Sequence, residues 1–131
     1  MGPPAVVGTQ VRIDVHPDVS PSRADDIIRI AGLVRPGEWT SYGDVAAAAL
    51  GGRRWARLVG TVAAVDVRFP NAHRILTSAG RVSRPGDDIV AARQALQAEG
   101  VAFSGGRADR RRRVYWDELQ RRDGRVARST G

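Results

Sequence analysis

The apolar positions between residues 23 and 34 recur at the spacing of a helix. Pro36 and Gly37 follow directly and end the pattern, so we predict a helix over 23–34. Ser22 is its expected N-cap, with Asp25 three residues later as the acid of a capping box. The side chains that define its apolar face are Ile27, Ile28, Ile30, Ala31 and Val34.

Two further helices are predicted around a glycine pair. The first begins at a cap, Thr40 or Ser41, with Asp44 in its first turn, where a negative charge suits the helix dipole. It ends at a Gly-Gly turn, 51–52, and an apolar face resumes at helical spacing over 54–65. Two helices joined by so short a turn form a helix-turn-helix, and the second would be the recognition helix.

A β-hairpin is expected next. Residues 74–77 and 81–83 are short, partly apolar runs on either side of Ser-Ala-Gly at 78–80. A hairpin beside a helix-turn-helix is the wing of a winged helix. The expected fold class is therefore mainly α with a small β wing, a winged helix-turn-helix.

The pattern predicts one more helix and two short strands before the chain becomes polar. The helix covers 87–99 and is stopped by Gly100. Residues 101–103 and 113–116 are candidate strands around the Gly-Gly turn at 105–106.

These elements divide the chain into three parts. Residues 1–22 are a proline-rich, extended lead-in, in which the alternating stretch 11–15 is a candidate strand. Residues 23–116 form the single domain. Residues 117–131 are polar and basic, and we expect them to be a fraying helix or a disordered tail.

Composition excludes several classes of protein. The chain has 131 residues and no cysteine, so disulfides, cysteine–metal sites and a thiol nucleophile are excluded. It contains no apolar run long enough to span a membrane, and its N-terminus does not have the pattern of a signal peptide. We expect a cytoplasmic protein, associated with the nucleoid if the chain is bacterial.

Charge is segregated along the chain. All 21 basic residues are arginine; residues 1–52 hold four of them against six acids, and residues 53–131 hold 17 against eight. A basic second half suggests a polyanionic partner. The alternative is that this basic part of the chain is solvated and has no partner. The same two interpretations hold for the arginine run at 110–113.

Candidate binding residues gather at the helix-turn-helix. Arg53, Arg54 and Arg57 stand at the start of the recognition helix, where they can neutralise phosphates or enter a groove. Trp55 among them could stack on a base or pack in the core. Tyr42, at the start of the first helix, could contact a phosphate through its hydroxyl or complete the core.

Enzymatic sites are poorly supported. His16 and His73 are the only histidines, and the chain shows no cluster with metal-ligand spacing. No nucleophile elbow, P-loop or dinucleotide fingerprint is present. We expect no metal and no cofactor.

Four motifs in order resemble one family. The run 35–46 (RPGEWTSYGDVA) is similar to the start of the O6-alkylguanine-DNA alkyltransferase C-terminal domain, and 56–60 (ARLVG) to its recognition-helix motif. The run 71–75 (NAHRI) falls where the family has its P-C-H-R-V active site. Residues 80–101, ending LQAEGV, resemble the wing and the segment that follows. The resemblance covers about residues 23–116.

The departures point to one branch of that family. Ala72 stands at the position of the alkyl-accepting cysteine, and a methyl side chain has no nucleophilic lone pair. Asn71 replaces the family proline, and the segment before it is shorter than usual. The absence of cysteine and the closing segment 113–116 are similar to the alkyltransferase-like proteins, cysteine-free relatives that bind alkylated DNA. The resemblance thus implies a protein that is not an enzyme.

The resemblance also implies a mechanism. Arg57 would enter the duplex through the minor groove and fill the vacated stack, while Tyr42 would press on the backbone and help to rotate the nucleotide. Partners would be alkylated double-stranded DNA and nucleotide excision repair proteins, with the protein itself a monomer. The implied lesion pocket comprises Tyr42, Ala72, His73, Arg74 and Ser83.

One alternative remains open. Asn71 and the shortened 58–71 segment are also compatible with a winged-helix DNA-binding protein, regulatory or architectural, that has no preference for alkylated DNA. Such a protein would bind damaged and normal duplexes alike.

Overall fold

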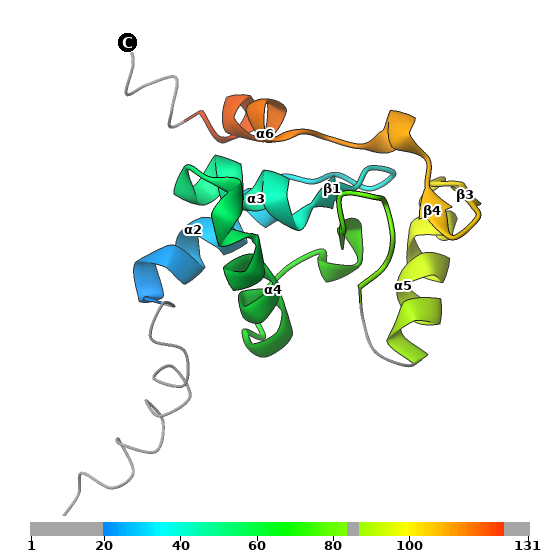
Figure 1. Ribbon diagram of the computed structural model, residues 1–131, viewed down its shortest axis with the longest axis horizontal. Helices are drawn as coiled ribbons and strands as arrows, with labels where there is room; N and C mark the ends of the chain where they lie inside the picture. The colour runs from blue at the N-terminus through cyan, green and yellow to red at the C-terminus, as the bar shows by residue number, and fades with distance from the viewer. Residues whose placement is uncertain (1–19, 84–86, 125–131) are drawn as a thin grey trace, which may run out of the picture.

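The computed structural model describes residues 20–83 and 87–124. Three helices pack against one another: α2 (Pro21–Ala31), α3 (Tyr42–Leu50) and α4 (Ala56–Val65), the last preceded by the 3-10 turn η1 (Arg53–Trp55). Helix α6 (Trp116–Asp123) lies along α3, and α5 (Asp87–Ala98) stands on the other side of the domain (Figure 1). The candidate strand at 11–15 lies outside the described residues.

The start of α2 differs from the prediction. Ser20, not Ser22, is the N-cap, and its hydroxyl accepts from the Arg23 amide at 3.2 Å. Pro21 then occupies the first helical position, where its missing N–H costs nothing and its fixed φ suits a helix. The helix ends at Ala31 and is capped by Gly32, so it ends earlier than the predicted 23–34.

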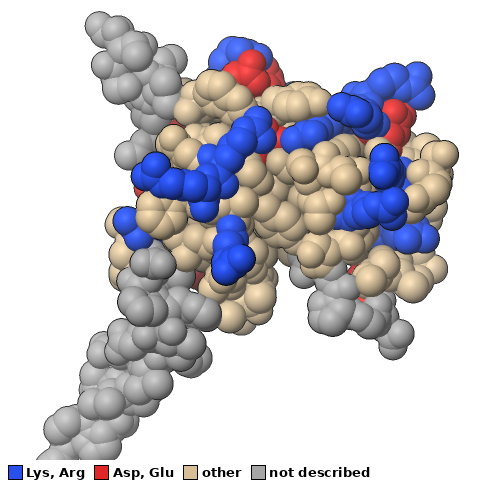
Figure 2. Space-filling view, viewed as in Figure 1, with Lys and Arg blue, Asp and Glu red and all other residues tan. Residues whose placement is uncertain are grey.

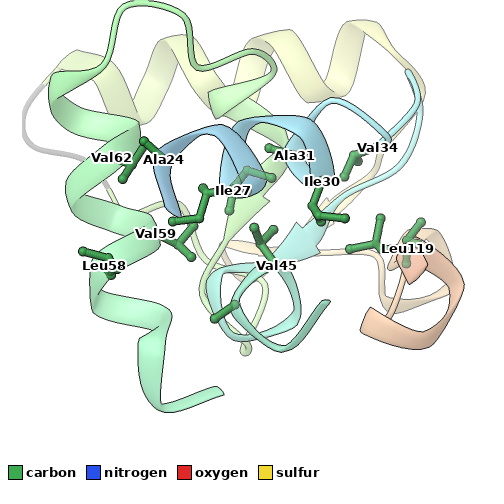
Figure 3. Close-up of a cluster of buried hydrophobic side chains, with 13 residues drawn as sticks. Ala24, Ile27, Ile30, Ala31, Val34, Val45, Leu58, Val59, Val62 and Leu119 are labelled. Atoms are coloured by element: carbon green, nitrogen blue, oxygen red, sulfur yellow. The ribbon is translucent and has the colours of Figure 1, made fainter. Parts of the chain in front are cut away.

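Buried apolar side chains from four helices form the main core (Figure 3). Helices α2 and α4 contribute the apolar faces that their spacing predicts, and α3 adds Val45 and Ala46. A second cluster, beside α5, is built around Trp39 and Leu96. The labelled members of the main core in Figure 3 are Ala24, Ile27, Ile30, Ala31, Val34, Val45, Leu58, Val59, Val62 and Leu119.

The expected hairpin between 74–77 and 81–83 is not formed as a pair of strands. Strand β2 (Ile75–Leu76) pairs in parallel with β1 (Thr40–Ser41), with Thr40 opposite Ile75 and Ser41 opposite Leu76. All four residues are buried, which is typical of parallel pairing. A tight turn does follow, in which the Thr77 amide donates to the Arg81 carbonyl at 3.0 Å.

The strands predicted at 101–103 and 113–116 do not pair with each other. Strand β3 (Phe103–Ser104) pairs with β4 (Arg107–Ala108) across the glycine turn, where both glycines have positive φ. The 3-10 turn η3 (Arg110–Arg112) follows. Arg113 instead forms a parallel bridge with Trp39, and the Val114 amide donates to the Trp39 carbonyl at 2.7 Å.

The predicted domain boundary at residue 116 is too early, because α6 is part of the folded unit. Leu119 is fully buried in the main core. Arg122 pairs with Glu38 at 2.7 Å, and its hydrogen bonds hold the pKa of that carboxyl below its usual value. Asp123 accepts from Arg29 at 2.9 Å. Residues 117–123 are therefore a packed helix rather than a tail.

Helices long and apolar enough to cross a membrane are not found among the residues that the structure describes.

Candidate nucleic-acid interface

Helices α3 and α4 form the predicted helix-turn-helix. Helix α3 ends at Gly51, which takes a left-handed conformation with φ of 83°, and Gly52 leads directly into η1. A residue with a side chain rarely adopts that φ, so Gly51 allows the reversal of the chain. The sequence places the recognition helix at 54–65, and the structure has η1 and α4 over that stretch.

The exposed start of the recognition helix carries three arginines. Arg53, Arg54 and Arg57 are all exposed. Arg53 is held by Asp44 of α3, with its Nη2 atom 3.4 Å from the carboxylate. Arg57 has no carboxylate partner among the described residues. The amides at a helix start also carry partial positive charge, so this end of α4 is suited to bind phosphate.

Trp55 supports these arginines rather than presenting an open ring. The guanidinium of Arg23 lies 4.7 Å from its ring centroid and that of Arg54 lies 5.2 Å away. The indole is half-buried and packs against the main core. Of the two interpretations of Trp55, core packing is the one that the structure favours. Arg23, which the sequence did not single out, joins the basic surface through this contact.

Tyr42 lies where the two helices of the motif meet. It is the first residue of α3, half-buried, and a Cβ atom on Gly60 of α4 would lie 3.9 Å from its ring. Ser41, which directly precedes Tyr42, pairs with Leu76 of β2. Leu76 follows Ala72 by four positions in the sequence. The pairing of β1 with β2 thus brings the segments of Tyr42 and Ala72 into the same part of the domain.

The predicted active-site segment forms a turn that depends on Asn71. This residue has φ of 55°, a left-handed conformation that proline cannot adopt. Its side-chain amide donates to the carbonyls of Ala31 and Val34 at 3.3 and 3.4 Å, at the end of α2. Ala72 opens the 3-10 turn η2 (Ala72–Arg74) and is half-buried. The loop is therefore supported by Asn71 at the position that the sequence resemblance assigns to the family proline.

His73 and Arg74 are fixed by a residue that the sequence did not single out. Glu99 accepts from Arg74 Nη2 at 2.7 Å and lies 2.8 Å from His73 Nε2. Hydrogen bonds from Arg74, then His73 and the Gly37 amide, lower the pKa of Glu99 to about 2. Arg74 also donates to the Val34 carbonyl, and its side chain is only 11% exposed. In the sequence, only the E-G pair of the LQAEGV motif indicates a role for Glu99.

The remaining residue of the predicted lesion pocket is Ser83. Ser83 is exposed in the segment after the Thr77 turn, and residues 84–86 lie outside the described ranges. A cavity of about 430 Å³ is present, but it lies beside the β3–β4 hairpin, and none of the five predicted pocket residues lines it. In the described ranges, no three His, Asp or Glu residues gather as a metal site would require.

The fold and this basic surface define a mainly α helix-turn-helix domain with small two-stranded sheets and an arginine-rich recognition helix. The chain belongs to the family described as 6-O-methylguanine DNA methyltransferase, DNA binding domain, whose sequence model matches residues 23–101.

Curated relatives and a solved structure agree with this assignment. The chain is 38% identical over 94 residues to the DNA base-flipping protein of Escherichia coli K12, covering 68% of this chain and 70% of the relative. It matches the DNA base-flipping protein of Shigella flexneri to the same extent. The crystal structure of S. pombe Atl1, in complex with damaged DNA containing O6-carboxymethylguanine, has a TM-score of 0.56 and 21% identity, covering 66% of this chain and 82% of that one. The predicted fold class is confirmed.

Proposed function

We propose that this chain is a non-catalytic DNA-binding protein that recognises O6-alkylguanine in duplex DNA by flipping the damaged nucleotide. The observation that carries the proposal is Arg57, exposed at the start of the recognition helix with no carboxylate partner among the described residues. The names of the relatives support it, because one is a base-flipping protein and another was solved with alkylated DNA.

Four residues of the interface act in this mechanism. Arg57 enters the duplex and fills the stack that the damaged base leaves, while Tyr42 presses on the backbone at the junction of α3 and α4. Arg53 and Arg54 neutralise phosphates. Flipping a nucleotide costs a few kcal/mol, and less for a base that pairs poorly, so the lesion itself favours the flipped state.

The flipped base is received by the segment around Ala72. Tyr42, Ala72, His73 and Ser83 line the pocket, and Ala72 leaves room for an alkyl group because its side chain is small. Arg74 contributes indirectly: its ion pair with Glu99 at 2.7 Å fixes the turn that carries Ala72 and His73.

Ala72 occupies the position of the acceptor cysteine, so the alkyl group stays on the base. The chain has no cysteine that could accept it, and the alanine methyl has no lone pair to attack an alkyl carbon. Binding is therefore reversible. The bound protein, a cytoplasmic or nucleoid-associated monomer, marks the lesion for nucleotide excision repair proteins.

A fluorescence-anisotropy titration tests this function. The probes are a short duplex with one O6-methylguanine and the same duplex with guanine, both at physiological salt. We expect clear preference for the lesion, release by added salt, and no change in the mass of either the protein or the modified strand. Equal affinities would overturn lesion recognition and leave the alternative, a winged-helix DNA-binding protein without lesion specificity.

A further inference from the structure

The four consecutive arginines at 110–113 have different surroundings in the structure. Arg113 turns inward and pairs with the buried Asp44 at 2.8 Å. Arg111 folds back on Asp109 at 3.2 Å. Arg110 stays exposed and lines a cavity together with Arg107 of β4. The run is therefore not one continuous basic patch, and part of its charge faces this cavity.

The cavity combines arginines and apolar groups with one carboxylate, Asp109, which is already paired with Arg111. Its volume is about 430 Å³, and it lies between the turn at 78–79, the β3–β4 hairpin and η3. Besides the arginines, its lining includes the apolar side chains of Ala79, Phe103 and Ala108. A deoxyribose ring can contact such apolar atoms while its phosphate is bound by guanidinium groups, so the lining matches one stretch of DNA backbone.

A third arginine reaches the same hairpin from the turn after β2. A Cβ atom on Gly106 would lie 3.1 Å from Nη1 of Arg81, so the guanidinium lies directly over the glycine. Gly106 also has φ of 80°, so a side chain is disfavoured there on two counts. We call Arg81, Arg107 and Arg110 the hairpin arginines.

The hairpin arginines are not neutralised within the part of the chain that the structure describes. All three are exposed, and none has a carboxylate partner among those residues. By contrast, Arg68 lies 2.9 Å from Asp66, and Arg121 lies 2.7 Å from Glu118. Gathering like charges at one place is unfavourable unless an anion neutralises them.

The position of the hairpin arginines indicates which anion they bind. Figure 2 shows arginine side chains over the hairpin region and over the region of α3 and the start of α4 on one face of the molecule. A duplex bound at the start of the recognition helix would extend over this face, where the hairpin arginines also lie. We infer that the hairpin arginines bind backbone phosphates of that same duplex, as a second contact separate from the recognition helix. This inference rests on the proposed function for the presence of DNA, and it adds where the DNA is held.

Salt dependence of binding tests the second contact. Each neutralised phosphate contributes about 0.9 to the slope of log K against log salt. For an Arg107→Ala/Arg110→Ala variant we expect that slope to fall by about 2, with weaker binding to lesion and normal duplexes alike. The matched control is Arg68→Ala/Arg121→Ala, which removes the same charge at arginines already paired with carboxylates. A slope equal to that of the control would overturn the inference.

Two further measurements separate charge from structure and the second contact from lesion recognition. An Arg107→Lys/Arg110→Lys variant keeps both charges and should keep the wild-type slope. A loss of slope in this variant would show that structure rather than charge was disturbed, and it would count against the inference.

Lesion preference of the wild type is measured in the same titrations. If preference is absent but the slope still falls in the alanine variant, lesion recognition fails and the second contact stands. If preference is present but the slope is unchanged, the second contact fails and lesion recognition stands.

Discussion

Asp44 and Arg113 form a buried ion pair that joins the start of the helix-turn-helix to the segment before α6. Arg113 Nη2 lies 2.8 Å from Asp44 Oδ2, and their side chains are 7% and 0% exposed. The same carboxylate accepts from the Ser41 hydroxyl at 2.7 Å and from the Trp116 amide at 3.2 Å. It also holds Arg53 of the recognition helix. One carboxylate therefore connects three parts of the interface.

Replacing Arg113 with alanine should destabilise the protein strongly. The substitution leaves the Asp44 charge buried without its main partner, a change that typically costs about 3–5 kcal/mol of unfolding free energy. Urea unfolding monitored by tryptophan fluorescence measures this. The control is Arg121→Ala, an exposed arginine for which we expect a loss below about 1 kcal/mol. Similar losses for both variants would show that the Asp44–Arg113 pair is not a structural link.

Leu119 tests whether α6 belongs to the folded unit. Its side chain is fully buried in the main core, so Leu119→Ala should lower the unfolding free energy by about 2–5 kcal/mol. Val90 of α5, which is 55% exposed, provides the control, and Val90→Ala should change stability by less than about 0.5 kcal/mol. If Leu119→Ala behaves like Val90→Ala in thermal or urea unfolding, α6 is not packed in solution.

The helix-turn-helix could be predicted from sequence because its signals are local. Apolar residues recur at helical spacing over 54–65, and a glycine pair stands between the two helices. The basic start of the recognition helix is equally local, since three arginines lie within five residues.

The contacts that hold the interface together could not be predicted, because they join distant segments. Asp44 is the first-turn acid that the sequence predicts, and Arg113 belongs to an arginine run. Their pairing across 69 positions follows only from the fold. Ile75 and Leu76 carry no alternation that would show pairing with β1 rather than with 81–83. Leu119 is the one apolar residue in the polar sequence 117–123, too little for a helical pattern.

The pKa of Glu99 predicts a loss of stability in acid. Its value falls from 4.5 to about 2 in the folded protein, chiefly through the hydrogen bond from Arg74. Between these values the unfolded chain binds more protons than the folded one, so stability decreases as the pH falls through this window. The shift corresponds to roughly 3 kcal/mol at most.

Glu99→Gln isolates this contribution from that of other carboxylates. Urea unfolding of the wild type and the variant is compared at pH 5 and at pH 2.5. The variant should be less stable at pH 5, because Arg74 and His73 lose their anionic partner, and it should lose less stability on acidification. Parallel losses in the two proteins would mean that Glu99 is not held as a carboxylate by Arg74.

Arg57 should affect lesion recognition more than general DNA binding. Its side chain is exposed at the start of α4, and in the proposed mechanism it touches DNA inside the stack only when a nucleotide has flipped. Arg57→Ala should therefore weaken binding to the O6-methylguanine duplex about tenfold or more, which is about 1.4 kcal/mol, and weaken binding to the normal duplex much less. Arg54→Ala is the matched control: it removes a phosphate contact from the same surface, so both duplexes should lose affinity equally. Anisotropy titrations of the two variants against the two duplexes give four affinities, each of which is compared with that of the wild type on the same duplex. An equal loss on both duplexes for Arg57→Ala would reduce Arg57 to one more phosphate contact, and the flipping mechanism would lose the residue that fills the stack.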